Sequence, residues 1–356
     1  MHRAAFRQRA GDEMTMILGL ESSCDDTSVA LVTGDRRILA HAVVGQNAAH
    51  QPYGGVVPEI AARAHVEILP GLIRRVLDEA AVTVDDLDAI AATAGPGLIG
   101  GVMVALLAGK GLALASGKPL IAVNHLEGHA LSPRLVDPDL AFPYLLLLVS
   151  GGHCQLLEVR SVGDYRRLAT TIDDAAGEAF DKAAKLLGLG YPGGPAIEEL
   201  AKRGDAKAVP LPRPLVGSGE PHFSFAGLKS AVQRAVASRD HTSEDIAAGF
   251  QQAVVDCLVD RTSVALGKTD VEALVVAGGV AANQPIRTAL ADLAQRSGRQ
   301  FSVPPAWLCT DNAAMIAWAG IERFAAGLTD ALDAPARARW PLDPEAEKVR
   351  GAGVKA

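Results

Sequence analysis

The chain has 356 residues, 49% of them hydrophobic, and a formal net charge of −7 at pH 7. This length and composition allow two globular domains with substantial cores. The negative charge argues against a freestanding nucleic-acid binder, because such proteins are usually basic. The 4 cysteines show no C-x-x-C spacing, so neither a zinc knuckle nor a disulfide framework is indicated, and reduced thiols in a cytoplasm fit best.

The N-terminal segment 1–15 is rich in arginine, with acidic residues only near its end. It resembles a short transit segment, but an upstream start codon placed before Met14 or Met16 explains it equally well. We favour the second interpretation and therefore exclude this N-terminal extension from the expected fold.

Two pairs of segments repeat one order of elements along the chain. Residues 18–32 and 145–159 each consist of two apolar runs around a small polar turn, which is typical of a β-hairpin. Residues 88–95 and 272–278 each predict a buried strand that runs into glycines and then a helix. The economical explanation is two homologous α/β lobes around a cleft, with chance similarity of generic α/β pieces as the alternative.

We expect the first lobe to span 16–124 and the second to span 125–308. An insertion near 190–225 contains several prolines, which indicates either an ordered excursion or a mobile loop. Residues 309–332 should form a C-terminal helix that closes the expected metal site, which is described below. Residues 333–356 are rich in Pro, Ala and charged residues, so a loosely ordered tail is predicted.

No segment is expected to cross a membrane. The apolar run Phe142–Val149 is too short, and the stretch Leu98–Ala115 contains Lys110 and several glycines. We expect Leu98–Ala115 to pack in the core, with a partner-binding face as a secondary interpretation.

The strongest chemical pattern is a pair of histidines, His125 and His129, one helical turn apart. Residues four apart share a helix face, so the two imidazoles can bind one metal ion. An H-E-x-x-H protease needs a glutamate directly after the first histidine, where this chain has Leu126. Glu127 is rotated about 200° from the pair. The pattern predicts a metal site without a protease's base, and two surface histidines are the alternative.

Three glycine-rich turns could hold phosphate. Segments 95–101 and 278–283 each link a strand to a helix, where backbone N–H groups attract anions. Segment 150–152 lies at a hairpin tip and can form an anion-binding nest. None is a Walker loop, and such turns also commonly connect a strand to a helix without binding a ligand. Together they predict a nucleotide cleft.

Several aspartates have both a chemical and a structural interpretation. Asp25 and Asp26 could hold a metal-bound phosphate or act as a base, although an Asx turn is favoured for Asp26. Asp181 could bind a ribose hydroxyl or pair with Lys185 one turn on. Asp311 precedes an apolar helix and is an N-cap by default, but it is also a suitable third metal ligand.

Many ordered blocks between Met16 and Arg323 match one known family. They are Gly19–Asp25, His50–His65, Asn124–His129, Leu148–His153, Asp174–Lys182, Tyr191–Pro195, Phe223–Lys229, Gly278–Asn283 and Cys309–Ala314. The chain thereby resembles the TsaD/Gcp family of tRNA adenosine threonylcarbamoyltransferases. The resemblance implies the actin-like (ASKHA, RNase H-like) α/β fold of sugar kinases and chaperone ATPases. The departures are small: Asp26 replaces a common Glu, and Ala226 replaces a common Ser.

The resemblance also implies site residues and a reaction. The metal ligands would be His125, His129 and Asp311, and we assign proton removal or orientation at the catalytic centre to Asp25. The reaction would move the threonylcarbamoyl group from threonylcarbamoyl-adenylate to the N6 amine of the adenosine adjacent to the anticodon, in tRNAs that read ANN codons. The positions expected to bind the adenylate are Leu148, Val149, Ser150, Gly151, Gly152, Asp181, Gly194 and Asn283.

The same resemblance implies a divalent metal cofactor and protein partners. A His2-carboxylate set accepts iron and zinc, and iron is favoured. The expected partners are tRNA, a TsaB-type paralogue and a TsaE-type ATPase, without a membrane. The rival functions are a metallopeptidase and a non-catalytic, chaperone-like nucleotide-binding module, and the latter would leave the expected metal ligands without a role.

Overall fold

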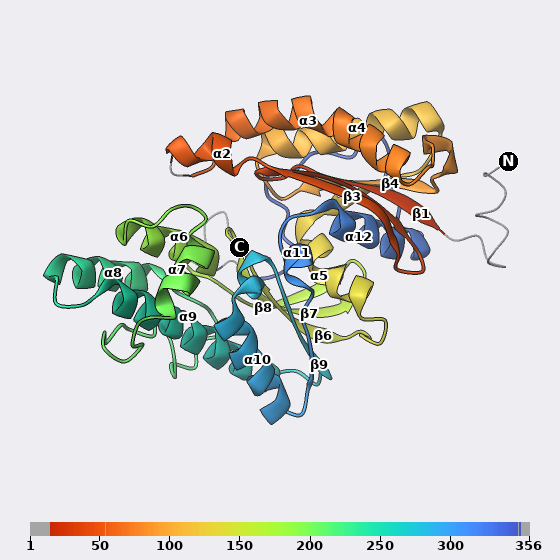
Figure 1. Cartoon of the computed structure of the whole chain (residues 1–356). Helices are drawn as coiled ribbons and strands as arrows, with labels where there is room; N and C mark the ends of the chain where they lie inside the picture. Colours follow the sequence, from red (N-terminus) through yellow and green to blue (C-terminus); the bar gives the residue numbers. More distant parts are fainter. Residues whose placement is uncertain (1–14, 54, 348, 350–356) are drawn as a thin grey trace. The chain divides into compact units, whose positions relative to one another are not determined.

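The chain forms two compact α/β units, each built on one five-stranded sheet (Figure 1). The computed structural model describes residues 15–53, 55–347 and 349. The first unit comprises Met1–Val136 and Asp311–Trp340, and the second comprises Asp137–Thr310 and Pro341–Ala356. Apart from residue 15, the expected N-terminal extension lies outside the described residues.

The sheet of the first unit has the strand order β3-β2-β1-β4-β5. An antiparallel meander joins β1 (Met16–Glu21), β2 (Asp26–Thr33) and β3 (Ile38–Gly45), which confirms the predicted first hairpin. Strands β4 (Ala89–Gly95) and β5 (Leu120–Asn124) continue the sheet parallel to β1. Both β1 and β4 are buried along their whole length, as central strands covered on two faces should be.

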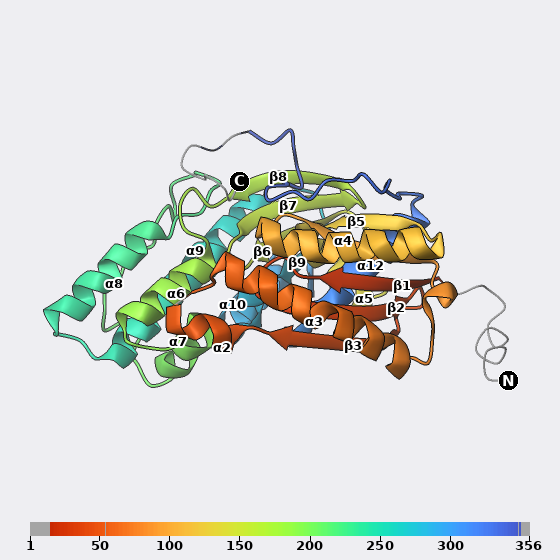
Figure 2. The same cartoon turned by 90° about the horizontal axis from the view of Figure 1, so that it is seen from above.

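Helices cover both faces of this first sheet. On one face, α3 (Pro58–Glu79) packs against β2 and β3, and α4 (Ile99–Ser116) packs against β4; Figure 2 shows the two helices side by side. On the other face, α12 (Ala313–Ala325) packs against β1, β2 and β4, and α5 (His125–Val136) packs against α12. The short helix α2 (Asn47–His50) precedes α3 in the chain. Short 3-10 turns occupy Gln51–Tyr53 and Val84–Asp86.

The second unit repeats the topology of the first. Its strand order is β10-β9-β6-β7-β8, with an antiparallel meander of β6 (Tyr144–Val149), β7 (Cys154–Ser161) and β8 (Asp164–Thr170). Strands β9 (Ala273–Ala277) and β10 (Gln300–Ser302) add in parallel beyond β6. Both sheets therefore share one order and one pattern of strand directions, which confirms the predicted duplication.

The helices of the second unit share one large core with its sheet. The insertion between α7 and α8 is ordered within this core, because Val209 and Leu211 are buried. Its prolines therefore lie in an ordered excursion, one of the two expected alternatives. The helices are α6 (Ala176–Leu186), α7 (Gly193–Ala201), α8 (Ala226–Ser238), α9 (Ser243–Leu266), α10 (Gln284–Arg296) and α11 (Ala306–Cys309), with a 3-10 turn at Gly279–Ala282.

The unit boundaries differ from those expected. Helix α5 belongs to the first unit, not to a second lobe beginning at residue 125, because it packs against α12. The predicted loose tail is also wrong for residues 333–340. Arg337 N–H donates to Ala94 O at 2.8 Å, and Trp340 packs near Leu106 in a small cluster. Composition alone missed this docking because the segment is held by contacts with residues that are distant in the sequence.

Helix α4 is the one helix in the described part of the chain whose length and composition would allow it to cross a membrane. Its buried side, which includes Val102, Ala105 and Leu106, packs in the core as expected, but this covers only 33% of the helix. An apolar stripe stays exposed on its other side: Ile99 at 47%, Met103 at 45%, Leu107 at 55% and Leu114 at 71%.

Candidate functional site

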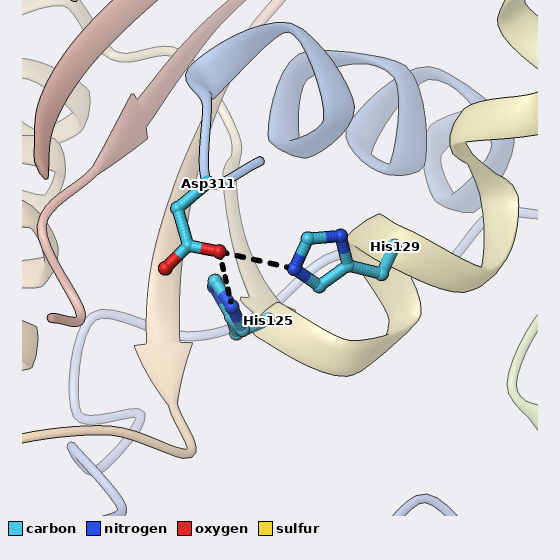
Figure 3. A group of neighbouring side chains, drawn as sticks. All are labelled: His125, His129 and Asp311. Atoms are coloured by element: carbon cyan, nitrogen blue, oxygen red, sulfur yellow. Dashed lines mark hydrogen bonds and ion pairs between the residues drawn. The ribbon is translucent and has the colours of Figure 1, made fainter. Parts of the chain in front are cut away.

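The two histidines stand in the first turns of α5, directly after β5 (Figure 3). The Asn124 side chain stabilises the start of this helix, because its Oδ1 accepts a hydrogen bond from Leu126 N at 2.9 Å. His125 and His129 are 8% and 0% exposed, with ring centroids 4.8 Å apart. The structure thus excludes the alternative of two surface histidines.

Asp311 joins the two histidines from the turn before α12. Its Oδ1 lies 3.1 Å from His129 Nε2 and 3.4 Å from His125 Nε2, as the dashed lines in Figure 3 indicate. The default interpretation of Asp311 as an N-cap is wrong, because Asn312 caps α12 by accepting from Met315 N at 2.9 Å. The side chain of Asp311 is therefore available for the site.

Charge is concentrated in this small group. Burial opposes ionisation of Asp311, but His125 and His129 outweigh it, so the pKa of Asp311 is held well below its usual range. Burial likewise opposes protonation of His125, yet the carboxylates of Asp311 and Glu21 raise its pKa well above the ordinary value. Burial lowers the pKa of His129, and repulsion by His125 adds to that effect.

The donor set fits a divalent metal ion. One ligand atom from each of His125, His129 and Asp311 lies within 4.8 Å of the other two. Two imidazoles and one carboxylate form a set that binds iron or zinc. The Nδ1 atom of His125 is held by a carboxylate, Glu21, so its Nε2 is the atom turned toward Asp311. The residues present therefore suit the metal that the sequence predicts.

Glu127 lies away from this set. Its carboxylate is buried and pairs with Arg323 Nη1 at 3.0 Å. A metallopeptidase needs a carboxylate that reaches a metal-bound water, whereas Glu127 holds a neighbouring helix. The sequence-based interpretation that Glu127 is rotated away from the histidines agrees with this contact.

The two aspartates of the first turn differ in environment. Asp26 is the first residue of β2, opposite Gly45, rather than part of the favoured Asx turn. Burial and then the nearby charges of Asp311, Asp25 and Glu21 raise the pKa of Asp26 to about 7. The backbone carbonyl of Asp25 accepts from Gln46 N at 3.0 Å. The proposed catalytic role of Asp25 stays a prediction.

The first expected phosphate loop contacts other segments of the chain. Two of its backbone N–H groups are used within the protein: Gly97 N donates to Ala338 O and Leu98 N donates to Ser23 O. A Cβ atom at Gly95 would lie 1.9 Å from Arg337 O. Glycine at position 95 thus admits the C-terminal segment, and phosphate binding by segment 95–101 stays a prediction.

The turn after β6 leaves its two glycines accessible to a ligand. Two hydrogen bonds join the ends of the turn: Ser150 N donates to His153 O at 2.8 Å, and His153 N donates to Ser150 Oγ at 3.1 Å. Gly151 and Gly152 are exposed, and a Cβ at either would meet nothing within 4 Å. The preceding pair, Leu148 and Val149, has fully buried side chains, so only their backbone could face a ligand.

The other expected adenylate positions lie in the same unit. Asp181 on α6 accepts from Gly193 N at 2.8 Å, which ties the start of α7 and Gly194 to α6. Asn283 caps α10 through Ile286 N at 3.2 Å, and its amide also donates to Glu198 and Gln251. Direct contact between Asp181 or Asn283 and a nucleotide stays a prediction.

Gly278 has a packing reason for being glycine. Its φ is +95°, and a Cβ there would lie 2.3 Å from Val149 O. The end of β9 thus approaches the end of β6 closely. All proposed metal ligands belong to the first unit, and all expected adenylate positions belong to the second.

Sequence reasoning missed Glu21, whose carboxylate contacts His125 Nδ1 at 2.9 Å. The signal was present, because a glutamate in the otherwise apolar strand β1 is a charge in a buried position.

Comparisons with known proteins agree on one family. The family model described as TsaD: tRNA N6-adenosine threonylcarbamoyltransferase matches residues 37–318. Proteins named tRNA N6-adenosine threonylcarbamoyltransferase are similar over nearly the whole chain. The one from Sphingopyxis alaskensis is 76% identical, and the one from Erythrobacter litoralis is 69% identical, each covering 96% of this chain and 100% of the relative.

Solved structures show the fold. HypF from T. kodakarensis has a TM-score of 0.59 at 15% identity, covering 88% of this chain and 48% of that one. Component A of (R)-2-hydroxyglutaryl-CoA dehydratase from Acidaminococcus fermentans has a TM-score of 0.53 at 17% identity, covering 87% and 99%. Both agree with the predicted duplicated, actin-like fold.

Proposed function

Because the chain belongs to the tRNA N6-adenosine threonylcarbamoyltransferase family, it is a transferase that modifies tRNA, and we propose that this transfer depends on a divalent metal held by His125, His129 and Asp311. The observation that carries the proposal is the convergence of both Nε2 atoms on one carboxylate oxygen of Asp311, at 3.1 and 3.4 Å. Iron is the metal we favour, with zinc as the alternative, because both suit two imidazoles and a carboxylate.

The donor we propose is threonylcarbamoyl-adenylate. Its adenylate is a good leaving group, so the protein needs no nucleophile of its own. The N6 amine of adenosine is a weak nucleophile, and the reaction therefore depends on positioning and on activation of the donor. A divalent ion at the site would supply Lewis-acid polarisation of the carbamoyl carbonyl.

The chain's own residues would bind and orient the reactants. The open backbone at Gly151 and Gly152 suits an anion nest for the adenylate phosphate. Asp181, Gly194 and Asn283 would complete the nucleotide site in the same unit. Asp25 would orient the attacking amine or accept its proton.

The two rival functions are weaker. A metallopeptidase lacks its base, because the Glu127 carboxylate is paired with Arg323 at 3.0 Å. A non-catalytic nucleotide-binding module would not need two buried histidines and an aspartate gathered as metal ligands. The duplicated fold alone is shared by proteins of many activities and does not distinguish them.

The proposed protein partners come from the family resemblance, and the net charge and the exposed face of α4 support them. A chain at −7 repels tRNA overall, so we propose that tRNA binding requires a TsaB-type paralogue and a TsaE-type ATPase. The stripe Ile99, Met103, Leu107 and Leu114 is an apolar surface of the kind that partners cover. All four cysteines are free thiols, which supports a cytoplasmic location.

Substitution of each ligand tests the metal proposal. His125→Ala, His129→Ala and Asp311→Ala should each lose bound metal and transferase activity while the far-ultraviolet circular dichroism stays that of the wild type. Elemental analysis and transfer from synthetic threonylcarbamoyl-adenylate to tRNA provide the readouts. Full metal occupancy in any variant would remove that residue from the ligand set.

A further inference from the structure

Glu21, the last residue of β1, is a fully buried carboxylate surrounded by three polar partners. Ser23 N donates to its Oε1 at 2.5 Å, and Thr93 Oγ1 donates to its Oε2 at 2.6 Å. His125 Nδ1 lies 2.9 Å from the same Oε2. A buried carboxylate is costly unless such partners satisfy it, and here the partners come from the β1–β2 turn, β4 and α5.

We propose that Glu21 is a positioning residue for the candidate metal centre: it keeps the proton of His125 on Nδ1 and so leaves the Nε2 lone pair for the metal. An ionised carboxylate can only accept hydrogen bonds, so the imidazole atom that faces it must carry hydrogen. The opposite ring atom, Nε2, lies 3.4 Å from Asp311 Oδ1 and so carries hydrogen as well in metal-free protein. A bound metal would displace that hydrogen, while the Nδ1–H contact with Glu21 is kept. Metal-binding histidines commonly donate their second N–H to a carboxylate in this way.

The second histidine lacks an equivalent contact. His129 Nδ1 is buried and has no hydrogen-bond partner among the described residues, whereas its Nε2 faces Asp311 at 3.1 Å. Among the described residues, a carboxylate therefore contacts the Nδ1 atom of only one of the two rings, that of His125. Loss of Glu21 would remove the contact that sets the proton position in the pair.

Glu21→Gln gives a sharp test because the replacement keeps size and shape. Ser23 N–H can only donate, so the amide oxygen must stay on the Ser23 side. The NH2 group of Gln then faces His125 Nδ1 and requires a lone pair there, which moves the ring proton to Nε2. We expect Zn²⁺ to bind about 10–100-fold more weakly, the usual loss when such an outer contact is removed.

Two measurements decide the proposal, which rests on the proposed metal centre. Competition with a fluorescent chelator gives the Zn²⁺ affinity. Nuclear magnetic resonance of ¹⁵N-labelled histidine shows which ring atom of His125 carries hydrogen. In the wild type, Nδ1 should carry it with and without Zn²⁺, and in Glu21→Gln it should not.

Matched variants separate Glu21 from its neighbours. Thr93→Val removes one donor but keeps the carboxylate, and Ser23→Ala removes a hydroxyl that lies 3.1 Å from His125 Nδ1. Both should keep the Nδ1 proton and bind Zn²⁺ within a few-fold of the wild type. Circular dichroism establishes that each variant folds.

Three outcomes would overturn the proposal: a wild-type His125 without hydrogen on Nδ1, an unchanged Zn²⁺ affinity in Glu21→Gln, or an equal loss in Ser23→Ala. The first is measured on the wild type and holds even when Glu21→Gln fails to fold. If the wild type binds no Zn²⁺ at all, the metal proposal fails, while the ring-proton measurement on metal-free protein still tests the contact with Glu21.

Discussion

Replacing Gly95 with alanine should destabilise the protein by displacing its C-terminal segment. Gly95 has φ +132°, and a Cβ there would lie 1.9 Å from Arg337 O. The backbone strain contributes about 1–3 kcal/mol. Two hydrogen bonds are at risk, Arg337 N to Ala94 O at 2.8 Å and Gly97 N to Ala338 O at 3.3 Å. At about 1 kcal/mol each, they bring the expected loss to about 3–5 kcal/mol.

Gly117 provides the matched control. It has φ +68°, but a Cβ there would meet nothing within 4 Å, so Gly117→Ala should cost only the strain of about 1–2 kcal/mol. Urea unfolding followed by circular dichroism measures both. In a chain truncated after Leu332, Gly95→Ala should lower the free energy of unfolding by less, because the C-terminal segment that it would displace is absent.

A phosphate loop would behave differently. If segment 95–101 cradled phosphate, Gly95→Ala would change nucleotide affinity and leave the free energy of unfolding close to that of Gly117→Ala. A difference between the two variants below about 1 kcal/mol, the value of one hydrogen bond, would refute the packing explanation. The same conclusion would follow if truncation left the Gly95→Ala effect unchanged.

Three further predictions concern charge. In metal-free protein, Asp26 has a pKa of about 7 against an ordinary value of 3.8, so the folded state binds the proton more tightly and the free energy of unfolding should fall as pH rises between these values. Asp26→Asn should flatten that fall in pH-dependent urea titrations, and an unchanged slope would contradict the assignment. Glu127→Gln should keep metal and transferase activity but lower stability by about 1–3 kcal/mol, because it removes the closer of the two carboxylates that face the largely buried Arg323. Metal-dependent proteolysis that this variant abolishes would instead support a peptidase. The isolated chain should bind tRNA weakly, with a salt slope of about 0.9 per neutralised phosphate, and turn over slowly until both partners are added; full multiple-turnover activity alone would disprove the partner requirement.

Local sequence patterns were sufficient for most of the fold. Short apolar runs bounded by polar or glycine turns predicted the hairpins that became β1–β2 and β6–β7, because strand formation and tight turns depend on neighbouring residues. Their repetition predicted the duplication that both sheets confirm. The spacing of His125 and His129 likewise determined that both side chains share a face of α5, since helical geometry alone places residues four apart together.

Local patterns did not show which distant groups meet: the family resemblance suggested the contact of Asp311 with the histidines, and only the tertiary structure showed that of Glu21. Asp311 lies 182 residues from His129, and Glu21 lies 104 residues from His125, so no local pattern could show either contact. Glycine at position 95 signalled a close approach, but whether phosphate or the chain's own C-terminal segment makes that approach depends on where residue 337 folds. The sequence determines a residue's local geometry and chemical capacity, whereas its partner depends on long-range packing that brings distant segments together.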